Sequence, residues 1–242
     1  MPLTNIRQEE VGNLLIASLP PEEFGRLAPG LARVELRAGR RLYDLEGAIR
    51  NVHFPEGGLF SLLSTLGDGA SVEVAALGRE GLGGLPVLLG SDAAVHTAAV
   101  QVGGAALRLK TERARECLGQ LPAFRAAVLR YARLLLAQVT RTTLCNTLHT
   151  VEQRLARWIL LGRMRLGSDT LPVTHEHLSQ MLGVRRSGVT VAVGALERAG
   201  LVTRGRGALT VAEPAGLKRV CCGCAAGLTD EYDSYINDLG VR

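Results

Sequence analysis

The segment from Leu171 to Val211 constrains the fold of this chain more than any other part of its sequence. Thr174 is a favoured N-cap residue, and the apolar residues after it recur at helical spacing, which predicts a short helix over 175–182. Gly183 allows the left-handed turn that ends this helix. A second helix is predicted from about Arg186 to Ala199. Two helices joined by a glycine turn are typical of a helix-turn-helix.

The residues after the second helix predict a wing. The sequence TRGRGALTV follows Val202 and is typical of a β-hairpin with two arginines at its tip. In a winged helix-turn-helix the start of the second helix meets base edges in the major groove of DNA, whereas the wing reaches phosphates. The candidate DNA-binding residues are therefore Thr174, Arg185, Arg186, Ser187, Thr190, Val191, Arg204 and Arg206.

Positive charge is concentrated in the same region. The whole chain has a formal net charge of +5, whereas residues 150–220 alone hold eleven basic and five acidic residues, a net +6. A basic region around a helix-turn-helix indicates a polyanionic partner, here double-stranded DNA. The tail over residues 221–242 is acidic instead.

A long helix is predicted upstream, because residues 123–148 contain neither glycine nor proline. Apolar residues there alternate at spacings of four and three, which is the pattern of a coiled-coil seam. This seam predicts a homodimer whose interface contains Val128, Ala132, Leu135 and Val139. The alternative is that the seam packs on the sheet of its own chain, and periodicity alone does not separate the two.

The first half of the chain predicts a β-structure. From Val34 to about Leu109, short apolar runs are broken by glycine, and Gly67-Asp68-Gly69 is a tight hairpin signal. We therefore expect an α+β fold. Its expected parts are an N-terminal antiparallel β-roll of the jelly-roll type (1–120), a long dimerisation helix (121–148), a winged helix-turn-helix (149–220) and a tail (221–242).

Composition excludes several classes of protein. With 47% hydrophobic and 21% charged residues among 242, the chain is expected to fold. No apolar run approaches the roughly 20 residues of a membrane helix, and the N-terminus carries acids where a signal peptide would be basic, so we expect a cytoplasmic protein without a membrane partner. The sequence has no G-x-S-x-G elbow, P-loop or H-E-x-x-H motif, so we do not expect an enzyme.

The cysteines leave two interpretations open. Five cysteines, three of them at Cys221, Cys222 and Cys224, do not form a disulfide framework in a chain of this length. Adjacent thiols could serve as a thiol sensor or as part of a metal site. A zinc site needs four ligands and no histidine lies close in sequence, so small buried thiols are favoured and no metal or cofactor is expected.

The segment HLSQMLGVRRSGVTVAVGALERAGLV resembles the DNA-reading motif of the CRP/FNR superfamily of bacterial regulators, and VEQRLARWIL resembles the helix that leads into it. The order of the predicted parts matches that family over nearly the whole chain. The resemblance implies a cyclic-nucleotide-binding-type β-roll and a homodimer bound to a pseudo-palindromic operator. It also implies transcription regulation, with RNA polymerase as a further partner.

The sequence departs from that family where members bind cyclic AMP through a Gly-Glu-Leu turn and an Arg-Ser pair. The counterparts implied for an effector pocket are Gly83, Gly84, Leu85, His96 and Thr97, with Thr140 from the long helix. Gly84 has no carboxylate and His96 is largely neutral at pH 7, so cyclic AMP is not expected to bind in the usual way. The iron–sulfur cysteines that oxygen-sensing members carry, mostly near the N-terminus, have no counterpart before Cys117.

A second function class is a ligand- or thiol-sensing regulatory or interaction module with weakened DNA binding. Such a module would have lost the exposed arginines of the second helix and the wing. This chain has Arg185, Arg186, Arg204 and Arg206 at those positions, which favours the DNA-binding function.

Overall fold

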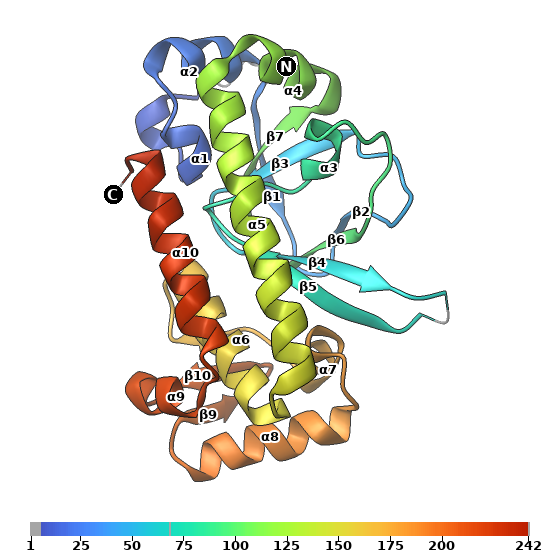
Figure 1. Cartoon of the computed structure of the whole chain (residues 1–242), viewed down its shortest axis with the longest axis vertical. Coiled ribbons are helices and arrows are strands. Elements are labelled where there is room, and N and C mark those ends of the chain that lie inside the picture. Colours follow the sequence, from blue (N-terminus) through green and yellow to red (C-terminus); the bar gives the residue numbers. More distant parts are fainter. Residues whose placement is uncertain (1–5, 68, 242) are drawn as a thin grey trace. The chain divides into compact units, whose positions relative to one another are not determined.

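The computed structural model describes residues 6–67 and 69–241 (Figure 1). Asp68, the centre of the predicted Gly67-Asp68-Gly69 turn, lies outside the described residues. The chain forms two compact units. The first unit contains the described residues up to 62, residues 76–136 and the residues from 231 on, and the second unit contains residues 63–75 and 137–230.

The first unit opens with short helical segments. These are the 3-10 turn η1 (Gln8–Glu10), α1 (Leu14–Ala17), α2 (Pro21–Leu27) and the 3-10 turn η2 (Ala28–Gly30). Buried Asn13 fixes α1: its side-chain oxygen accepts a hydrogen bond from the Ile16 amide, and its side-chain amide donates to the carbonyls of Pro55 and Gly81. One polar side chain therefore joins this segment to the rest of the unit.

The strands form the predicted antiparallel roll (Figure 1). One sheet has the order β1-β7-β3, formed by β1 (Ala32–Leu36), β7 (Gly104–Lys110) and β3 (Asn51–Pro55). The other has the order β2-β6-β4-β5, formed by β2 (Arg41–Tyr43), β6 (Thr97–Val102), β4 (Leu59–Thr65) and β5 (Ser71–Leu77). Phe54, Phe60 and Leu107 are among the fully buried side chains. The α+β fold class is confirmed.

Helices connect the sheets to the C-terminal part. After α3 (Leu85–Leu88) and α4 (Thr111–Gln120), the long helix α5 runs over Pro122–Leu148, as the absence of glycine and internal proline predicted. The next helix, α6 (Val151–Leu166), begins with a capping box in which Thr150 and Gln153 satisfy each other's backbone amides. Gly167 ends α6 in the left-handed conformation, at a φ of 60°.

The second unit contains the predicted winged helix-turn-helix. Its helices α7 (His175–Leu182) and α8 (Arg186–Arg198) are followed by a three-stranded sheet of order β8-β10-β9, formed by β8 (Thr170–Leu171), β10 (Ala208–Val211) and β9 (Val202–Gly205). Two more helices follow: α9 (Pro214–Val220) ends the predicted winged helix-turn-helix region, and α10 (Cys224–Leu239) lies where the sequence predicted only an acidic tail. Within this unit the indole of Trp158 on α6 donates a 3.1 Å hydrogen bond to Glu73 of β5.

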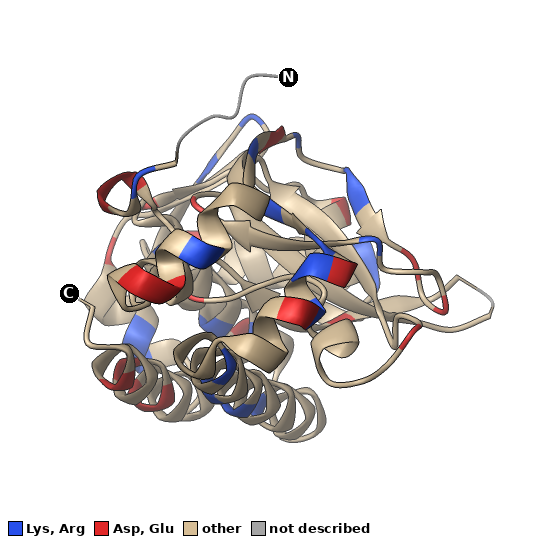
Figure 2. Cartoon of the chain, turned by 90° about the horizontal axis from the view of Figure 1, so that it is seen from above, with Lys and Arg blue, Asp and Glu red and all other residues tan. Residues whose placement is uncertain are grey.

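Charge on the first unit is locally balanced. Figure 2 shows basic and acidic residues interspersed over the elements nearest the viewer. Ion pairs account for part of this pattern, including Arg33 with Glu56 at 2.6 Å and Arg115 with Asp92 at 2.9 Å. None of the helices described is both long enough and apolar enough to cross a membrane.

Candidate nucleic-acid interface

Helix α7 begins and ends as its sequence dictates. The hydroxyl of Thr174 accepts a 3.2 Å hydrogen bond from the His177 amide and so caps the helix. Leu178 and Leu182 are buried on its inner side. Gly183 ends the helix at a φ of 60°, which a residue with a side chain rarely adopts. This turn sets the start of the next helix only a few residues later.

Helix α8 buries one side and exposes the other. Val189, Ala192, Val193 and Leu196 form its buried side. The predicted base-reading residues Arg186, Ser187, Thr190 and Val191 are all exposed near its start, and exposed Arg185 occupies its N-cap position. Val191 is 62% exposed and adds an apolar side chain to this group. The structure therefore brings the predicted residues together on one surface.

His175 on α7 also contributes to this surface. Its Nδ1 atom lies 3.2 Å from the hydroxyl of Thr190, which is also 3.1 Å from the carbonyl of Arg186. This contact fixes the Thr190 side chain between α7 and α8. Sequence spacing gives no sign of it, because residues 175 and 190 lie on different helices and meet only when the two helices pack.

The two wing arginines differ in their surroundings. Arg206 is exposed in the turn between β9 and β10, where Gly207 has a φ of 70°. Arg204 is also exposed, but its guanidinium is 2.5 Å from the carboxylate of Glu197 on α8. The hydrogen bond from Arg204 holds the pKa of Glu197 below its usual value, so this pair is charged at neutral pH. Arg204 is thus tied to α8, which the sequence did not reveal.

Three basic residues counted in the +6 region are not available to a polyanion. Arg154, Arg157 and Arg165 are buried on the inner side of α6. They recur at helical spacing, so they share the face of α6 that packs within the second unit. The basic count of residues 150–220 therefore includes three arginines that do not face solvent.

Two of the residues predicted for an effector pocket, Gly84 and His96, are linked by hydrogen bonds to one tyrosine. The hydroxyl of buried Tyr43 accepts a 3.1 Å hydrogen bond from the Gly84 amide and lies 3.1 Å from Nε2 of His96. Burial lowers the pKa of His96, so its ring is neutral at pH 7 and suited to this contact. Tyr43, which the sequence analysis did not single out, therefore links two of the residues predicted for an effector pocket.

Backbone geometry at Gly84 disfavours any residue with a side chain. Gly84 has a φ of 102°, and a Cβ atom there would lie 3.3 Å from Ile49 and from the backbone of Val52. Its neighbours are also engaged: Gly83 exchanges backbone hydrogen bonds with His53, and the Thr97 hydroxyl accepts one from the Leu45 amide. Buried Leu85 begins α3.

The residues predicted for a dimer interface on α5 differ in their exposure. Val128 is fully buried within its own unit, so the prediction that it contacts a second chain is wrong. Its neighbour Leu129 and the next heptad residue, Leu136, are 55% and 67% exposed. Ala132, Leu135 and Val139 are partly exposed, and Thr140 lies exposed beside Val139 in the second unit. Positions 128 and 129 are both apolar, and so are positions 135 and 136. Periodicity therefore did not show which residue of each pair is the more exposed.

Comparison with known proteins identifies the C-terminal part. The family model of the Crp-like helix-turn-helix domain matches residues 153–220, which include α7, α8 and the wing. The chain carries a Crp-like helix-turn-helix domain. This Crp-like domain therefore contains every predicted DNA-binding residue. No curated protein sequence is similar enough to count as a relative.

Solved structures extend the likeness to the whole fold. FixK2 from Bradyrhizobium japonicum is 15% identical, with 80% of this chain and 98% of that chain covered and a TM-score of 0.70. A CRP/FNR-family regulator from Eubacterium rectale is 15% identical, with 85% of this chain and 96% of that chain covered and a TM-score of 0.68. The c-di-GMP-responsive regulator CLP from Xanthomonas campestris is 14% identical, with 79% of this chain and 99% of that chain covered and a TM-score of 0.64. The resemblance to the CRP/FNR superfamily is confirmed, with the Crp-like domain as its most specific part.

Proposed function

We propose that this chain is a sequence-specific DNA-binding transcription regulator that acts as a homodimer on a pseudo-palindromic operator. The observation that carries the proposal is the exposed surface at the start of α8, where Arg185, Arg186, Ser187, Thr190 and Val191 lie together within a Crp-like domain. In helix-turn-helix dimers, two such helices enter successive major grooves about 34 Å apart.

The residue types on this surface suit base recognition. An arginine can donate two hydrogen bonds to the O6 and N7 atoms of guanine, the commonest specific contact in the major groove. Exposed Val191 and the methyl group of Thr190 are apolar groups of the kind that contact the methyl group of thymine. A mixture of guanidinium and methyl groups therefore supports discrimination between bases rather than attraction to phosphate alone.

The wing supplies the phosphate contacts in this proposal. Arg206 at its tip carries a free charge toward solvent, whereas Arg204 is paired with Glu197 in the protein alone. Phosphate contacts carry most of the sequence-independent affinity and make binding sensitive to salt. The ion pair with Glu197 would reduce the attraction of Arg204 to phosphates until the wing contacts DNA.

The exposed apolar stripe of α5 supports the homodimer. Leu129, Ala132, Leu136 and Val139 repeat at spacings of three and four, which is the seam of a two-stranded coiled coil. Two leucines more than half exposed on one helix face are costly in water, and a second copy of the same helix would cover them.

Selection of bound sequences from random DNA tests the function. We expect an enriched inverted repeat whose half-site centres lie about 10 base pairs apart, or a multiple of one helical turn. Enrichment is expected to be equal with and without cyclic AMP, because the Tyr43 hydrogen bonds occupy Gly84 and His96. Enrichment only with cyclic AMP would contradict the expectation that the β-roll does not bind this nucleotide in the usual way. No enrichment in any condition would favour the alternative function, a regulatory or interaction module with weakened DNA binding.

Substitution of Arg186 tests the recognition helix. On the selected operator, Arg186→Ala is expected to weaken binding by about 1 to 3 kcal/mol and to relax base preference at one position of each half-site. Fluorescence anisotropy on operator and random duplexes measures both effects. Arg198→Ala removes the same charge from the far end of α8 and serves as control. An equal loss for Arg186→Ala on both duplexes would make Arg186 a phosphate contact.

Substitution of Leu136 tests the dimer. Leu136→Glu would place two carboxylates in the centre of the proposed seam, so the variant is expected to be a monomer at micromolar concentration while the parent chain is a dimer. Light scattering coupled to gel filtration measures the molar mass. Leu89→Glu is the matched control, because Leu89 is 55% exposed and lies outside α5. A monomeric parent chain would rule out the proposed dimer.

Substitution of Glu197 tests the restraint on the wing. Glu197→Gln removes a negative charge and frees Arg204, so affinity for random DNA is expected to rise and the slope of log K against log salt to steepen by up to about 1. Titrations at several salt concentrations measure the slope. Glu112→Gln makes the same charge change on the exposed side of α4 and is expected to have a smaller effect. Equal effects of the two variants would show that only net charge matters.

A further inference from the structure

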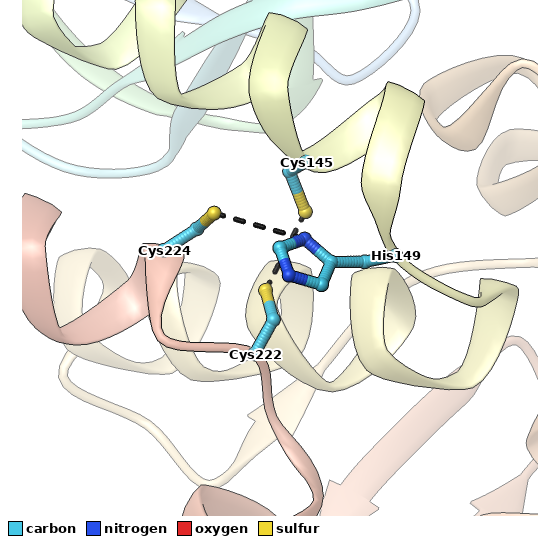
Figure 3. Close-up of side chains that lie close together, drawn as sticks. All are labelled: Cys145, His149, Cys222 and Cys224. Atoms are coloured by element: carbon cyan, nitrogen blue, oxygen red, sulfur yellow. Dashed lines mark hydrogen bonds between the residues drawn. The ribbon is translucent and has the colours of Figure 1, made fainter.

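Four potential metal ligands converge in the second unit. Cys145 and His149 come from the end of α5 and the residue after it, Cys222 from the turn after α9, and Cys224 from the first turn of α10 (Figure 3). Their ligand atoms all lie within 4.8 Å of one another. The sulfur atoms of Cys145 and Cys222 are 3.5 Å apart, and the sulfur of Cys224 is 3.8 Å from Nδ1 of His149.

Sequence spacing did not reveal this set. Cys145 and Cys222 are 77 residues apart in the chain, and Cys224 and His149 are 75 residues apart. The histidine that appeared to be missing near the C-terminal cysteines is supplied by the end of α5. The expectation of no metal site rested on its absence from the local sequence.

The donor set and its dimensions suit one tetrahedral ion. Three thiolates and one imidazole are a common ligand set of structural zinc. A tetrahedron with metal–sulfur bonds of about 2.3 Å has edges of about 3.8 Å, close to the two separations given above. In an iron–sulfur cluster the thiolates bind different iron atoms and are spread more widely, so these separations favour a single ion.

The cluster is enclosed, and it contains two of the three neighbouring C-terminal cysteines. The three cysteines of the set are buried and His149 is half-buried. Cys221, which directly precedes Cys222, is not part of the set, because its thiol donates to the carbonyl of Cys222 instead. A site with four protein ligands and little access to water is a structural site rather than a catalytic one.

Two buried arginines beside the cluster supply an independent observation. Arg157 reaches only the hydroxyl of Thr142, at 3.4 and 3.5 Å, and its Nε atom has no hydrogen-bond partner. Arg154 donates to the carbonyl of Leu182, and its Nε atom is likewise unpaired. Among the residues that the structure describes, no carboxylate pairs with either guanidinium. Buried charges normally have a partner of opposite sign, so we expect an anion near both arginines.

The thiol cluster lies within electrostatic reach of both arginines. The guanidinium group of Arg157 interacts electrostatically with Cys145. Arg154 also interacts with Cys145. A divalent ion bound by three thiolates and one neutral imidazole carries a net charge of −1. The loaded site would therefore be the anion that the buried guanidinium groups lack.

We infer that Cys145, His149, Cys222 and Cys224 bind one zinc-type divalent ion in a closed tetrahedral site. The ligands flank the Crp-like domain: two precede residue 153 and two follow residue 220. The ion would thus clip together the two ends of that domain and close a loop of more than seventy residues. Because the unfolded chain would not present this set preassembled, binding energy at the site contributes to folding.

Cobalt substitution of the full-length chain tests the site. After reduction and chelation, titration with Co²⁺ is expected to reach saturation at one ion per chain, with the intense visible bands of a tetrahedral ion and thiolate-to-metal absorption in the near ultraviolet. Added Zn²⁺ is expected to bleach these bands. A weak octahedral spectrum or the absence of stoichiometric binding would overturn the inference. Iron and inorganic sulfide in the chain purified without oxygen would overturn the assignment to a single ion.

Variants locate the ligands. Cys145→Ser and Cys222→Ser are expected to lose the thiolate bands, whereas Cys221→Ser and Cys117→Ser are expected to keep them. His149→Cys is expected to retain binding with a red-shifted spectrum, since a fourth thiolate replaces the imidazole. This variant keeps the test decisive if a serine variant fails to fold. Loss of binding in Cys221→Ser with retention in Cys145→Ser would contradict the proposed set.

Thermal unfolding gives a readout that does not depend on the spectrum. With Zn²⁺ in hundredfold excess over its dissociation constant, the midpoint of the parent chain is expected to rise by about 5 to 10 °C over the chelated chain. The rise is expected to vanish in Cys222→Ser and to persist in Cys221→Ser. The same midpoint with and without zinc in the parent chain would overturn the role of the ion as a clip. None of these measurements involves DNA.

Discussion

The division of the surface of α5 into buried and exposed stripes is the constraint on which the rest of this molecule depends. Phe124, Val128 and Tyr131 are buried in the first unit, and Cys145 is buried in the second. Leucines at other positions of the same helix stay exposed. A helix that is apolar on more than one side needs more than one surface to cover it. One side of α5 therefore belongs to the core of the chain, and another side is free for a partner.

The same principle separates the arginines of the C-terminal region. Those of α6 at positions 154, 157 and 165 point inward, whereas Arg185 and Arg186 at the start of α8 point to solvent. An exposed guanidinium can exchange its water for base edges or phosphates at small cost, but a buried one has already lost its water and needs an internal partner. Net charge in the sequence thus combines residues of two unlike roles, one for binding and one for the interior of the domain.

One hydroxyl group in the β-roll links the two residues on which the expectation about cyclic AMP rests. The resemblance places Gly84 and His96 where cyclic AMP receptors carry a glutamate and an arginine, and Tyr43 bonds to both. The positive φ of Gly84 is strained for a residue with a side chain, and a Cβ atom there would make tight contacts with Ile49 and Val52. The departure read from the sequence thus has a structural counterpart: a phenol hydroxyl that the sequence alone had not connected with these positions.

The sequence by itself determined whatever depends on near neighbours. The bounds of α7, the turn at Gly183, the exposed side of α8 and the hairpin of the wing follow from caps, glycine and periodicity within a few residues. The tertiary structure alone decided the contacts between distant segments. Packing exposes Leu129 and buries Val128 on α5. It also pairs Arg204 with Glu197 and places His149 next to Cys224. The physical reason is that local pattern fixes which residues share a face, whereas the packing of whole elements decides what each face meets.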